Sequence, residues 1–317
     1  MTRPAAALAN APHRAAPHRA APGPAAPTSP PPDRPLLGIG LMLASVALLP
    51  VMDGFAKSMT EVFAAAQLVW ARFLFQSMLI VPLALATSPR AMLRPSRLPL
   101  QVARGVGILF GTFLFFGAIR TMPIADALAL LFIAPLIVTA LSPLVLGEAV
   151  GIRRWSAVLV GFAGALVVLR PGLTVLQPGA LLALGAGVSF AGYVLLTRRL
   201  SHAAPPLVTL AWTSLVCLSA SSLAMPMVWV TPEPVQLAKM AAMGIIGAGG
   251  HYLMIRAFEK APAALIAPFG YAEIATATIV GYYWFGDFPD GWTWVGIAIL
   301  VASGIYISLR ERARRGA

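Results

Sequence analysis

The sequence predicts an all-α integral membrane protein with ten transmembrane helices, arranged as two inverted repeats of five helices each. Two observations lead to this prediction. Hydrophobic residues make up 59% of the 317 residues and charged residues only 11%, far below the roughly 25% charged of an average soluble domain. The second half of the chain also repeats the first, since residues 118–155 align without a gap with residues 257–294. An internal duplication of apolar helices is typical of transporters.

The repeat is marked by pairs of matching residues along both copies. Within the aligned window these pairs are Pro123 with Pro262, Gly147 with Gly286, Glu148 with Asp287 and Trp155 with Trp294. After small gaps the flanks also match, at Gly38 with Gly179, Lys57 with Arg198 and Gly164 with Gly304. Because each copy holds an odd number of predicted helices, the second copy enters the bilayer from the opposite side. The copies are therefore expected to be related by a pseudo-two-fold axis in the membrane plane.

Ten apolar stretches are long enough to cross a bilayer, for which about 20 predominantly apolar residues are needed. Their ranges are 36–56, 63–86, 99–119, 124–146, 152–169, 178–197, 206–230, 237–256, 263–285 and 292–309. The first five form one repeat at residues 36–172, and the last five form the other at residues 173–311. Residues 1–35 and the basic residues 312–317 are expected to be tails outside the repeats.

Several residues indicate how particular stretches pack or begin. The eighth stretch contains Gly249 and Gly250, and small residues of this kind let membrane helices approach closely. Cys217, in the seventh stretch, is the single cysteine of the sequence and can form no intramolecular disulfide. We therefore expect its side chain to serve as a small apolar group. Glu148 and Asp287 each precede the next helix, where the helix dipole favours an anion. We do not expect these two acids to bind substrate.

Residues 1–35 are rich in Ala and Pro and carry the sequence Ala-Pro-His-Arg-Ala twice, at 11–15 and 16–20. They contain no apolar run, so we predict a disordered segment. The apolar region of a secretory signal is missing, whereas the Arg-rich, acid-poor composition leaves an organellar transit peptide as an alternative. His13 and His18 either bind a metal or are solvated, and solvation is the expectation in a flexible tail.

The formal net charge of +12 raises the question of nucleic-acid binding, so the distribution of the 23 Lys and Arg residues is informative. With the N-terminus in the cytoplasm, most of them fall on the cytoplasmic side. The exceptions are Arg72, within a helix, and Lys57, Arg120, Arg170 and Lys239 on the opposite face. This is the positive-inside bias of a membrane protein with both termini in the cytoplasm. Nucleic acid is therefore not an expected partner.

The chain resembles the EamA-type branch of the drug/metabolite transporter superfamily in the motifs at Pro123, Pro135 and Gly147-Glu148 and in their second copy at Pro262 and Gly286-Asp287. The resemblance extends from Leu36 to Glu311. The sequence Phe285-Gly-Asp-Phe-Pro-Asp290, followed by Ser303-Gly-Ile-Tyr306, is also similar to a bacterial subgroup that includes proteins described as S-adenosylmethionine or riboflavin transporters. The resemblance implies transport of a small metabolite, and a fold alone does not identify which one.

Glu273 is the first candidate for a role in transport. It stands near the middle of the ninth stretch, on the order of 15 Å from each interface at about 1.5 Å per residue. An unpaired charge at that depth costs at least ~2.5–3.5 kcal/mol, so the side chain should face a cavity or a partner. We expect it to carry a proton or bind a cationic group, with a neutral structural glutamate as the alternative. The family pattern places a proline after this acid, where the chain has Ile274.

Further candidates are polar and aromatic residues in other predicted spans and in the same one. Arg72, with its neighbours Trp70 and Gln76, is expected either to frame a carboxylate or phosphate of the substrate or to be a structural arginine. His251 either relays a proton or is a structural histidine. Tyr271 is expected to line the cavity, with lipid or core contact as the alternative.

Four residues are candidates for gating. Pro135 and Pro268 each remove a backbone hydrogen bond within a span, so we expect bends there, either used in gating or static. Asp53 and Lys57 stand at i and i+4 near the outer end of the first stretch. We expect these two to pair with each other, and a role in gating the outer mouth is the alternative.

These features predict a transporter that moves a small organic metabolite by alternating access around a cavity between the repeats, with proton coupling left open. The alternative is a membrane-embedded enzyme such as a transferase, but the sequence has no His-x-x-x-His pair, Asp-rich metal motif or nucleophile elbow. No enzyme activity, cofactor or metal is therefore expected. The expected partners are a small-molecule substrate and the lipid bilayer, with a homodimer left open. The expected location is the inner membrane, as a multi-pass protein.

Overall fold

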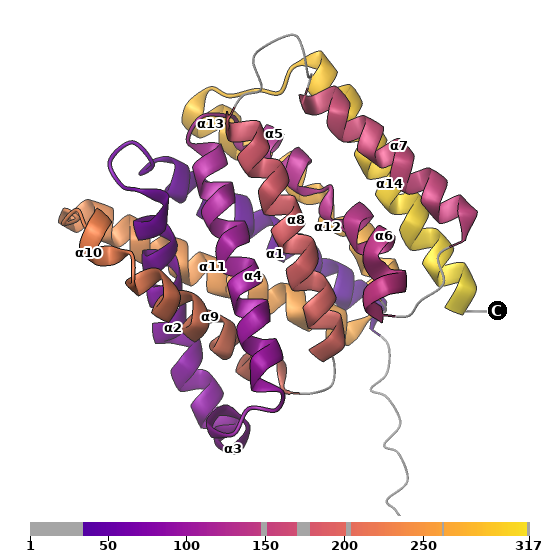
Figure 1. Ribbon diagram of the computed structural model, residues 1–317. Helices are drawn as coiled ribbons and strands as arrows, with labels where there is room; N and C mark the ends of the chain where they lie inside the picture. The colour runs from indigo at the N-terminus through magenta and orange to yellow at the C-terminus, as the bar shows by residue number, and fades with distance from the viewer. Residues whose placement is uncertain (1–33, 147–150, 170–177, 201–203, 262, 316–317) are drawn as a thin grey trace, which may run out of the picture. The chain divides into compact units, whose positions relative to one another are not determined.

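The computed structural model describes residues 34–146, 151–169, 178–200, 204–261 and 263–315, which form α-helices and no strand (Figure 1). The all-α prediction is confirmed for these residues. The predicted N-terminal tail to residue 33, the pair Gly147-Glu148, Arg170 and Pro262 lie outside them. The longest helices are α1 (Pro35–Lys57), α2 (Ala65–Thr87), α4 (Leu98–Ile119), α7 (Ile152–Leu169), α8 (Pro178–Leu200), α11 (Pro234–Lys260) and α14 (Gly291–Arg315).

Local sequence signals account for where several helices begin. Proline stands in the first turn of α1 and α11, where its missing N–H needs no intrahelical partner. At the start of α11 the Glu233 N–H also donates to Gln236 Oε1 at 2.9 Å. At the start of α14 the Thr293 N–H donates to Asp290 Oδ1 at 2.9 Å. Asp290, rather than the predicted Asp287, therefore supplies the anion at this helix terminus.

Two of the predicted spans are interrupted, and the prediction of single helices there is wrong. Residues 124–146 form α5 (Ile124–Leu131) and α6 (Ala134–Leu146), whereas residues 263–285 form α12 (Ala263–Gly270) and α13 (Ala272–Phe285). Pro135 explains the first interruption, because a proline ring clashes with the carbonyl four residues earlier, and α5 ends there. Pro135 therefore lies in the first turn of α6. Pro268 stays inside α12, and the chain turns at Tyr271.

The two interruptions meet in space. The offset that aligns residues 118–155 with 257–294 also pairs Phe132 with Tyr271, the residues at which the two spans break. Their ring centroids lie 4.9 Å apart. The two breaks therefore pack against each other where α5 contacts α13.

The predicted boundaries also change around the seventh and eighth stretches. The single helix expected at 206–230 is α9 (Pro206–Ser222) followed by the short α10 (Met225–Val228). Pro226 stands in the first turn of α10, which is consistent with a new helix rather than a continued one. The helix α11 is longer at both ends than the expected 237–256. The short α3 (Pro89–Leu93) lies between α2 and α4.

Six segments of the described chain are long and apolar enough to cross a membrane: Pro35–Lys57, Ala65–Thr87, Leu98–Ile119, Ile124–Val145, Ile152–Leu169 and Pro178–Thr197. Two further apolar segments, Pro206–Ser222 and Gly291–Ile307, are shorter. Several helices are therefore long and apolar enough to span a membrane, and the number ten stays a prediction.

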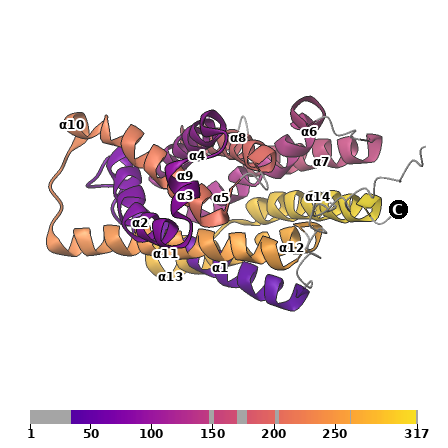
Figure 2. The ribbon, with the colours of Figure 1, turned by 90° about the horizontal axis from the view of Figure 1, so that it is seen from below.

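The helices pack in pairs that join the two halves of the chain (Figures 1 and 2). Extensive contacts link α1 with α11, α4 with α8, α2 with α9, and α7 with α14. Small residues allow this proximity: a Cβ at Gly250 would lie 2.7 Å from Leu49 Cδ2, and a Cβ at Gly296 would lie 2.8 Å from the Gly164 carbonyl oxygen. The expected close packing at Gly250 is confirmed.

Candidate functional site

The structure brings four of the predicted site residues together inside the bundle. Asp53 of α1, Arg72 of α2, His251 of α11 and Glu273 of α13 form what we call the central polar cluster. Arg72 interacts electrostatically with Asp53 and with His251, and Asp53 interacts with Glu273. Asp53 and Arg72 are only 4% and 5% exposed, so these charges are screened little by solvent.

Arg72 is held by one hydrogen bond and two aromatic rings. Its Nη1 donates to Thr112 Oγ1 at 3.2 Å, and its Cζ lies 5.1 Å from the ring centroid of Phe73 and 5.9 Å from that of Phe116. Its buried Nε has no hydrogen-bond partner among the described residues. A Cβ at Gly247 would lie 3.6 Å from this Nε and 2.7 Å from Met52 Sδ, so the glycine lets α11 pack closely beside Arg72. The guanidinium therefore retains a donor directed at no protein acceptor.

Gln76, one turn further along α2, has a buried acceptor that makes no hydrogen bond to the described residues. Its Nε2 donates to Ser214 Oγ at 2.7 Å, whereas its buried Oε1 has no partner in the described part of the chain. A buried polar group without a partner costs about 1–3 kcal/mol. The same face of α2 thus presents an unused donor at Arg72 and an unused acceptor at Gln76.

Glu273 occupies the first turn of α13, immediately after the break at Tyr271. It lies in the middle of the predicted span, as expected, but at the start of a helix rather than within one. The N-terminal end of a helix favours an anion through the helix dipole and its unpaired N–H groups. The interruption therefore gives the carboxylate a polar environment that an unbroken helix lacks. The repeat pairs Glu273 with Ala134, so the other copy has no acid at this position.

The orientation of His251 follows from its hydrogen bond. Its Nδ1 lies 2.9 Å from the Gly247 carbonyl oxygen. Because a carbonyl oxygen only accepts, Nδ1 carries the hydrogen, and Nε2 is the nitrogen that can exchange a proton. The side chain is half-buried beside Arg72. The structure is compatible with both predicted roles of this histidine.

The expected pair between Asp53 and Lys57 is wrong. Lys57 forms an ion pair with Asp287, and its Nζ donates to the Met122 carbonyl oxygen at 2.9 Å. Gly286, with a φ of 72°, ends α13 in the left-handed region, and the Asp287 N–H donates to the Gly281 carbonyl at 3.0 Å. This turn holds Asp287 close to Lys57, while Asp53 interacts with Arg72 instead.

Trp70 and Tyr271 do not join the central polar cluster. The Trp70 Nε1 donates to Ser222 Oγ at 3.0 Å, and its ring packs edge-on against Trp229 at 5.5 Å. Tyr271 packs on Phe132, and its hydroxyl lies against the backbone of Gly304 in α14. These contacts favour the predicted alternative of core contact for Tyr271.

Arg104 forms a second buried group of hydrogen bonds that the sequence analysis missed. The positive-inside argument counted this arginine among the basic residues on the cytoplasmic side. It is 1% exposed and donates four hydrogen bonds, to Thr197 Oγ1, the Thr209 carbonyl, Thr213 Oγ1 and Tyr193 Oη. These contacts join α4, α8 and α9. Its position inside the third apolar stretch, next to Gly105, was the available signal.

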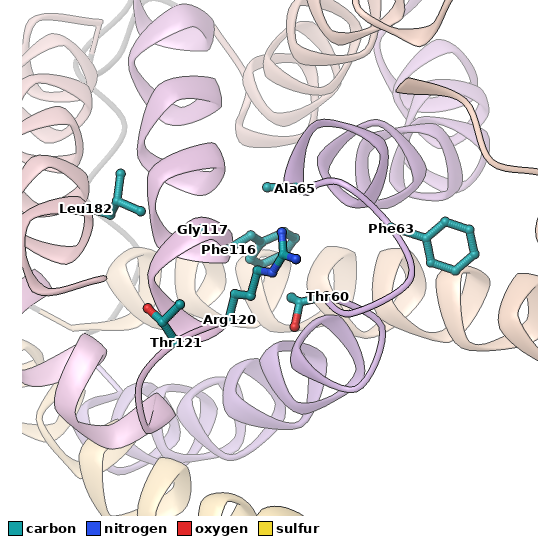
Figure 3. Close-up of a pocket in the computed structure, with 8 residues that line it drawn as sticks. All are labelled: Thr60, Phe63, Ala65, Phe116, Gly117, Arg120, Thr121 and Leu182. Atoms are coloured by element: carbon teal, nitrogen blue, oxygen red, sulfur yellow. The ribbon is translucent and has the colours of Figure 1, made fainter. Parts of the chain in front are cut away.

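A second site, which we call the Arg120 pocket, lies at the end of α4 (Figure 3). Its volume is about 490 Å³, within the range of roughly 300–1,000 Å³ of small-molecule pockets. The lining side chains come from α4, α8 and the connection between α1 and α2, and include Thr60, Phe63, Phe116, Arg120, Thr121 and Leu182. Arg120 was noted in the sequence only as an exception to the basic-residue bias.

Comparison with known proteins adds to this geometry. The model of the EamA-like transporter family matches residues 36–170 and again residues 177–309. An S-adenosylmethionine uptake transporter of Rickettsia prowazekii is 26% identical over 277 residues, which cover 87% of this chain and 94% of the relative. A riboflavin transporter of Vibrio cholerae is 34% identical over 193 residues, which cover 60% of this chain and 64% of the relative. One crystal structure shares the fold, with a TM-score of 0.62 and 22% identity over 87% of this chain and 98% of the other.

Proposed function

Because the chain belongs to the EamA-like transporter family, we propose that it carries a small organic metabolite across the membrane by alternating access around the central polar cluster. The relatives are named as transporters and not as enzymes, and the protein is accordingly a multi-pass membrane transporter. The observation that carries the proposal is the convergence of Asp53, Arg72, His251 and Glu273 from four helices that are otherwise apolar.

The proposed layout is ten spans in two inverted repeats, at residues 36–172 and 173–311. The interrupted pairs α5–α6 and α12–α13 each count as one span. The family model matches the chain twice, which supports two copies. Helix packing supports the exchange expected of a pseudo-two-fold axis, because α1 and α4 of the first copy contact α11 and α8 of the second. The excess of basic residues on one side supports cytoplasmic termini and an inner-membrane location.

The charges of the cluster suggest how transport is driven. Asp53 and Glu273 are two carboxyl groups that interact with each other, and the Arg72 guanidinium interacts with Asp53. When both acids are ionised, the cluster lacks one positive charge, and an uncompensated charge in the interior is costly. A proton or a cationic group of the substrate supplies that charge. Exchange of one for the other couples substrate movement to proton movement.

The unused groups on α2 define where the polar part of the substrate binds. Arg72 Nε offers a donor and Gln76 Oε1 an acceptor, both buried and without a protein partner. A metabolite with an anionic and a donor group satisfies both at once. S-adenosylmethionine, which the Rickettsia prowazekii relative is named for, carries a carboxylate, an amino group and a sulfonium cation. It is therefore the first substrate to test.

The interrupted helices are the proposed moving parts. Phe132 and Tyr271 pack against each other at the two breaks, so a change in one half-helix reaches the other. Pro135 and Pro268 lie close to these breaks and allow bending without loss of many hydrogen bonds. Glu273 follows the second break directly, which links its protonation and ligand binding to helix movement.

Transport by purified protein in liposomes tests the proposal. We expect uptake of tritiated S-adenosylmethionine, and of riboflavin as the second candidate, to respond to an imposed pH gradient. Glu273→Gln keeps the shape of the side chain and should abolish that pH response. Glu259→Gln is the matched control, because this acid is exposed and pairs with Arg256 at the surface. Equal pH dependence of Glu273→Gln and wild type, at equal protein content, would remove Glu273 from the mechanism.

A further inference from the structure

The chemistry of the Arg120 pocket selects for an anion. Arg120 is the single charged residue of its lining, and no acid contributes to the pocket. Arg120 is exposed, and no hydrogen bond or ion pair to it is found in the part of the chain that the structure describes. Lys57, at the same end of the bundle, is already neutralised by Asp287. Arg120 is therefore the charged group that the pocket offers to a ligand, and a guanidinium offers a carboxylate or phosphate two parallel donors.

The two threonines of the pocket add a requirement for donors on the ligand. Thr60 Oγ1 donates to the Lys57 carbonyl at 2.9 Å, and Thr121 Oγ1 donates to the Ala118 carbonyl at 3.3 Å. Each hydroxyl hydrogen is thus committed to the backbone, which leaves the two hydroxyl oxygens available to a ligand only as acceptors. A molecule with an anionic group and N–H or O–H groups matches Arg120 and the threonines together.

The pocket is connected to the central polar cluster through one face of α4. Thr112, Phe116 and Arg120 follow one another at intervals of four residues, and such residues lie on one side of a helix. Thr112 accepts a hydrogen bond from Arg72, and Phe116 contacts the Arg72 guanidinium. Phe116 also lines the pocket, and Figure 3 shows its ring beside the Arg120 guanidinium. Phe116 is therefore part of the surroundings of both arginines.

We infer that the Arg120 pocket is an outer binding site for the anionic group of the transported metabolite, which then passes Phe116 to reach Arg72. The inference rests on the proposed transport function and on the orientation that places this end of α4 outside. It defines the substrate class as a small organic acid that carries hydrogen-bond donors, such as an amino acid or an amino-acid derivative. An anionic lipid headgroup has the same charge, so the test separates the two sources.

Charge-selective labelling tests the site without requiring transport. Cys217 is buried, so Thr121→Cys introduces one accessible thiol into the pocket. The quantity measured is the labelling rate of the anionic reagent sulfonatoethyl methanethiosulfonate divided by that of the cationic trimethylammonioethyl reagent. This ratio should be higher with Arg120 present than in the same protein with Arg120→Gln. We expect the ratio of the two rates to fall about tenfold, because each reagent senses the lost charge with opposite sign. Leu182→Cys provides a second reporter should Thr121→Cys fail to fold.

Matched variants make the outcome specific. Lys239→Gln removes another cation that the sequence places on the same face, but its side chain does not line the pocket. It should leave the ratio of labelling rates unchanged, whereas Arg120→Lys should preserve most of it. An equal fall in Lys239→Gln would overturn the site by showing a general surface charge effect. An unchanged ratio in Arg120→Gln would overturn it directly.

Uptake measurements then connect the site to the substrate. Arg120→Gln should raise the KM for S-adenosylmethionine about tenfold with little change in the maximal rate, because the outer site acts before the transport step. The KM for riboflavin, which has no anionic group, should not change. S-adenosylmethionine should also protect Thr121→Cys from labelling in phosphatidylcholine vesicles. If Thr121→Cys is instead protected only in vesicles that contain the anionic lipid phosphatidylglycerol, the pocket binds a lipid headgroup and the inference is overturned. If the labelling rates follow the prediction but the protein takes up no substrate, the anion site is supported and the proposed transport function is rejected.

Discussion

Lys57 joins three segments of the chain, and removing its charge tests whether they hold together as one contact. Its Nζ donates to the Met122 carbonyl at 2.9 Å, pairs with Asp287 and lies 5.1 Å from the ring centroid of Phe285. These partners belong to the connection between α4 and α5 and to the end of α13. The side chains of Lys57 and Asp287 are 14% and 28% exposed, so the pair is partly shielded from water.

The size of the effect follows from these contacts. Lys57→Met keeps the apolar stem but removes a hydrogen bond from a charged donor, which contributes about 1.5–3 kcal/mol, and the partly buried ion pair. We therefore expect the free energy of unfolding to fall by about 2–3 kcal/mol. Asp287→Asn retains an acceptor oxygen and should lose about 1 kcal/mol. The double variant should lose about 1 kcal/mol less than the sum, because both changes remove the same ion pair.

Unfolding of the four proteins in a denaturing detergent measures the double-mutant cycle. Additive losses, within about 0.3 kcal/mol, would refute an interaction between the two side chains. The exchanged pair Lys57→Asp with Asp287→Lys is a further check. It should not restore stability, because a carboxylate at position 57 faces the Met122 carbonyl and has no hydrogen to donate. Full recovery in the exchanged pair would show that the carbonyl contact is unimportant.

Three other predictions concern the scaffold. Arg104→Met should lower the free energy of unfolding by more than about 3 kcal/mol, and a change below about 1 kcal/mol would contradict this role. Arg104→Lys should be destabilised as well, because an ammonium lacks the planar fork that reaches all four acceptors. Gly304→Ala should destabilise the protein because the new Cβ would overlap the Tyr271 hydroxyl. Adding Tyr271→Phe should relieve only part of this loss, because the ring carbon that carries the hydroxyl would still lie 2.5 Å from the Cβ, and no relief would argue against the contact. Reporter proteins fused to the C-terminus should be active in the cytoplasm, and a periplasmic signal would contradict the inverted repeat.

Most of the helical architecture was predictable because it depends on local composition. Apolar stretches of membrane length predict helices wherever they occur, and the structure confirms six such segments. The interruptions were less accessible. Pro135 signals one of them, since a proline ends the helix four residues earlier. The break at Tyr271 comes three residues after Pro268, which itself stays inside α12, and its position coincides with packing against Phe132 from the other half of the chain.

The candidate site shows a similar division between local and long-range signals. Glu273 and Arg72 stood out because charges are rare in apolar stretches, and the structure brings both into the central polar cluster. Asp53 and Lys57 were expected to pair because they are four residues apart. Each instead interacts with a residue from another helix or connection, Asp53 with Arg72 and Lys57 with Asp287. Spacing along one helix cannot indicate which partner the tertiary fold supplies.

The distribution of polar residues departs from the symmetry of the repeat in a way that suits transport. The offset that aligns the copies pairs Thr112 with His251 and Glu273 with Ala134. Thr112 and His251 both interact with the guanidinium of Arg72, so equivalent positions of the two copies flank one charge. Alternating access needs two similar end states, which a duplicated scaffold provides. A substrate with distinct charged ends needs a site that is not duplicated. Placing a titratable group on only one member of each pair meets both requirements, because a second acid at position 134 would add repulsion that a single guanidinium does not balance.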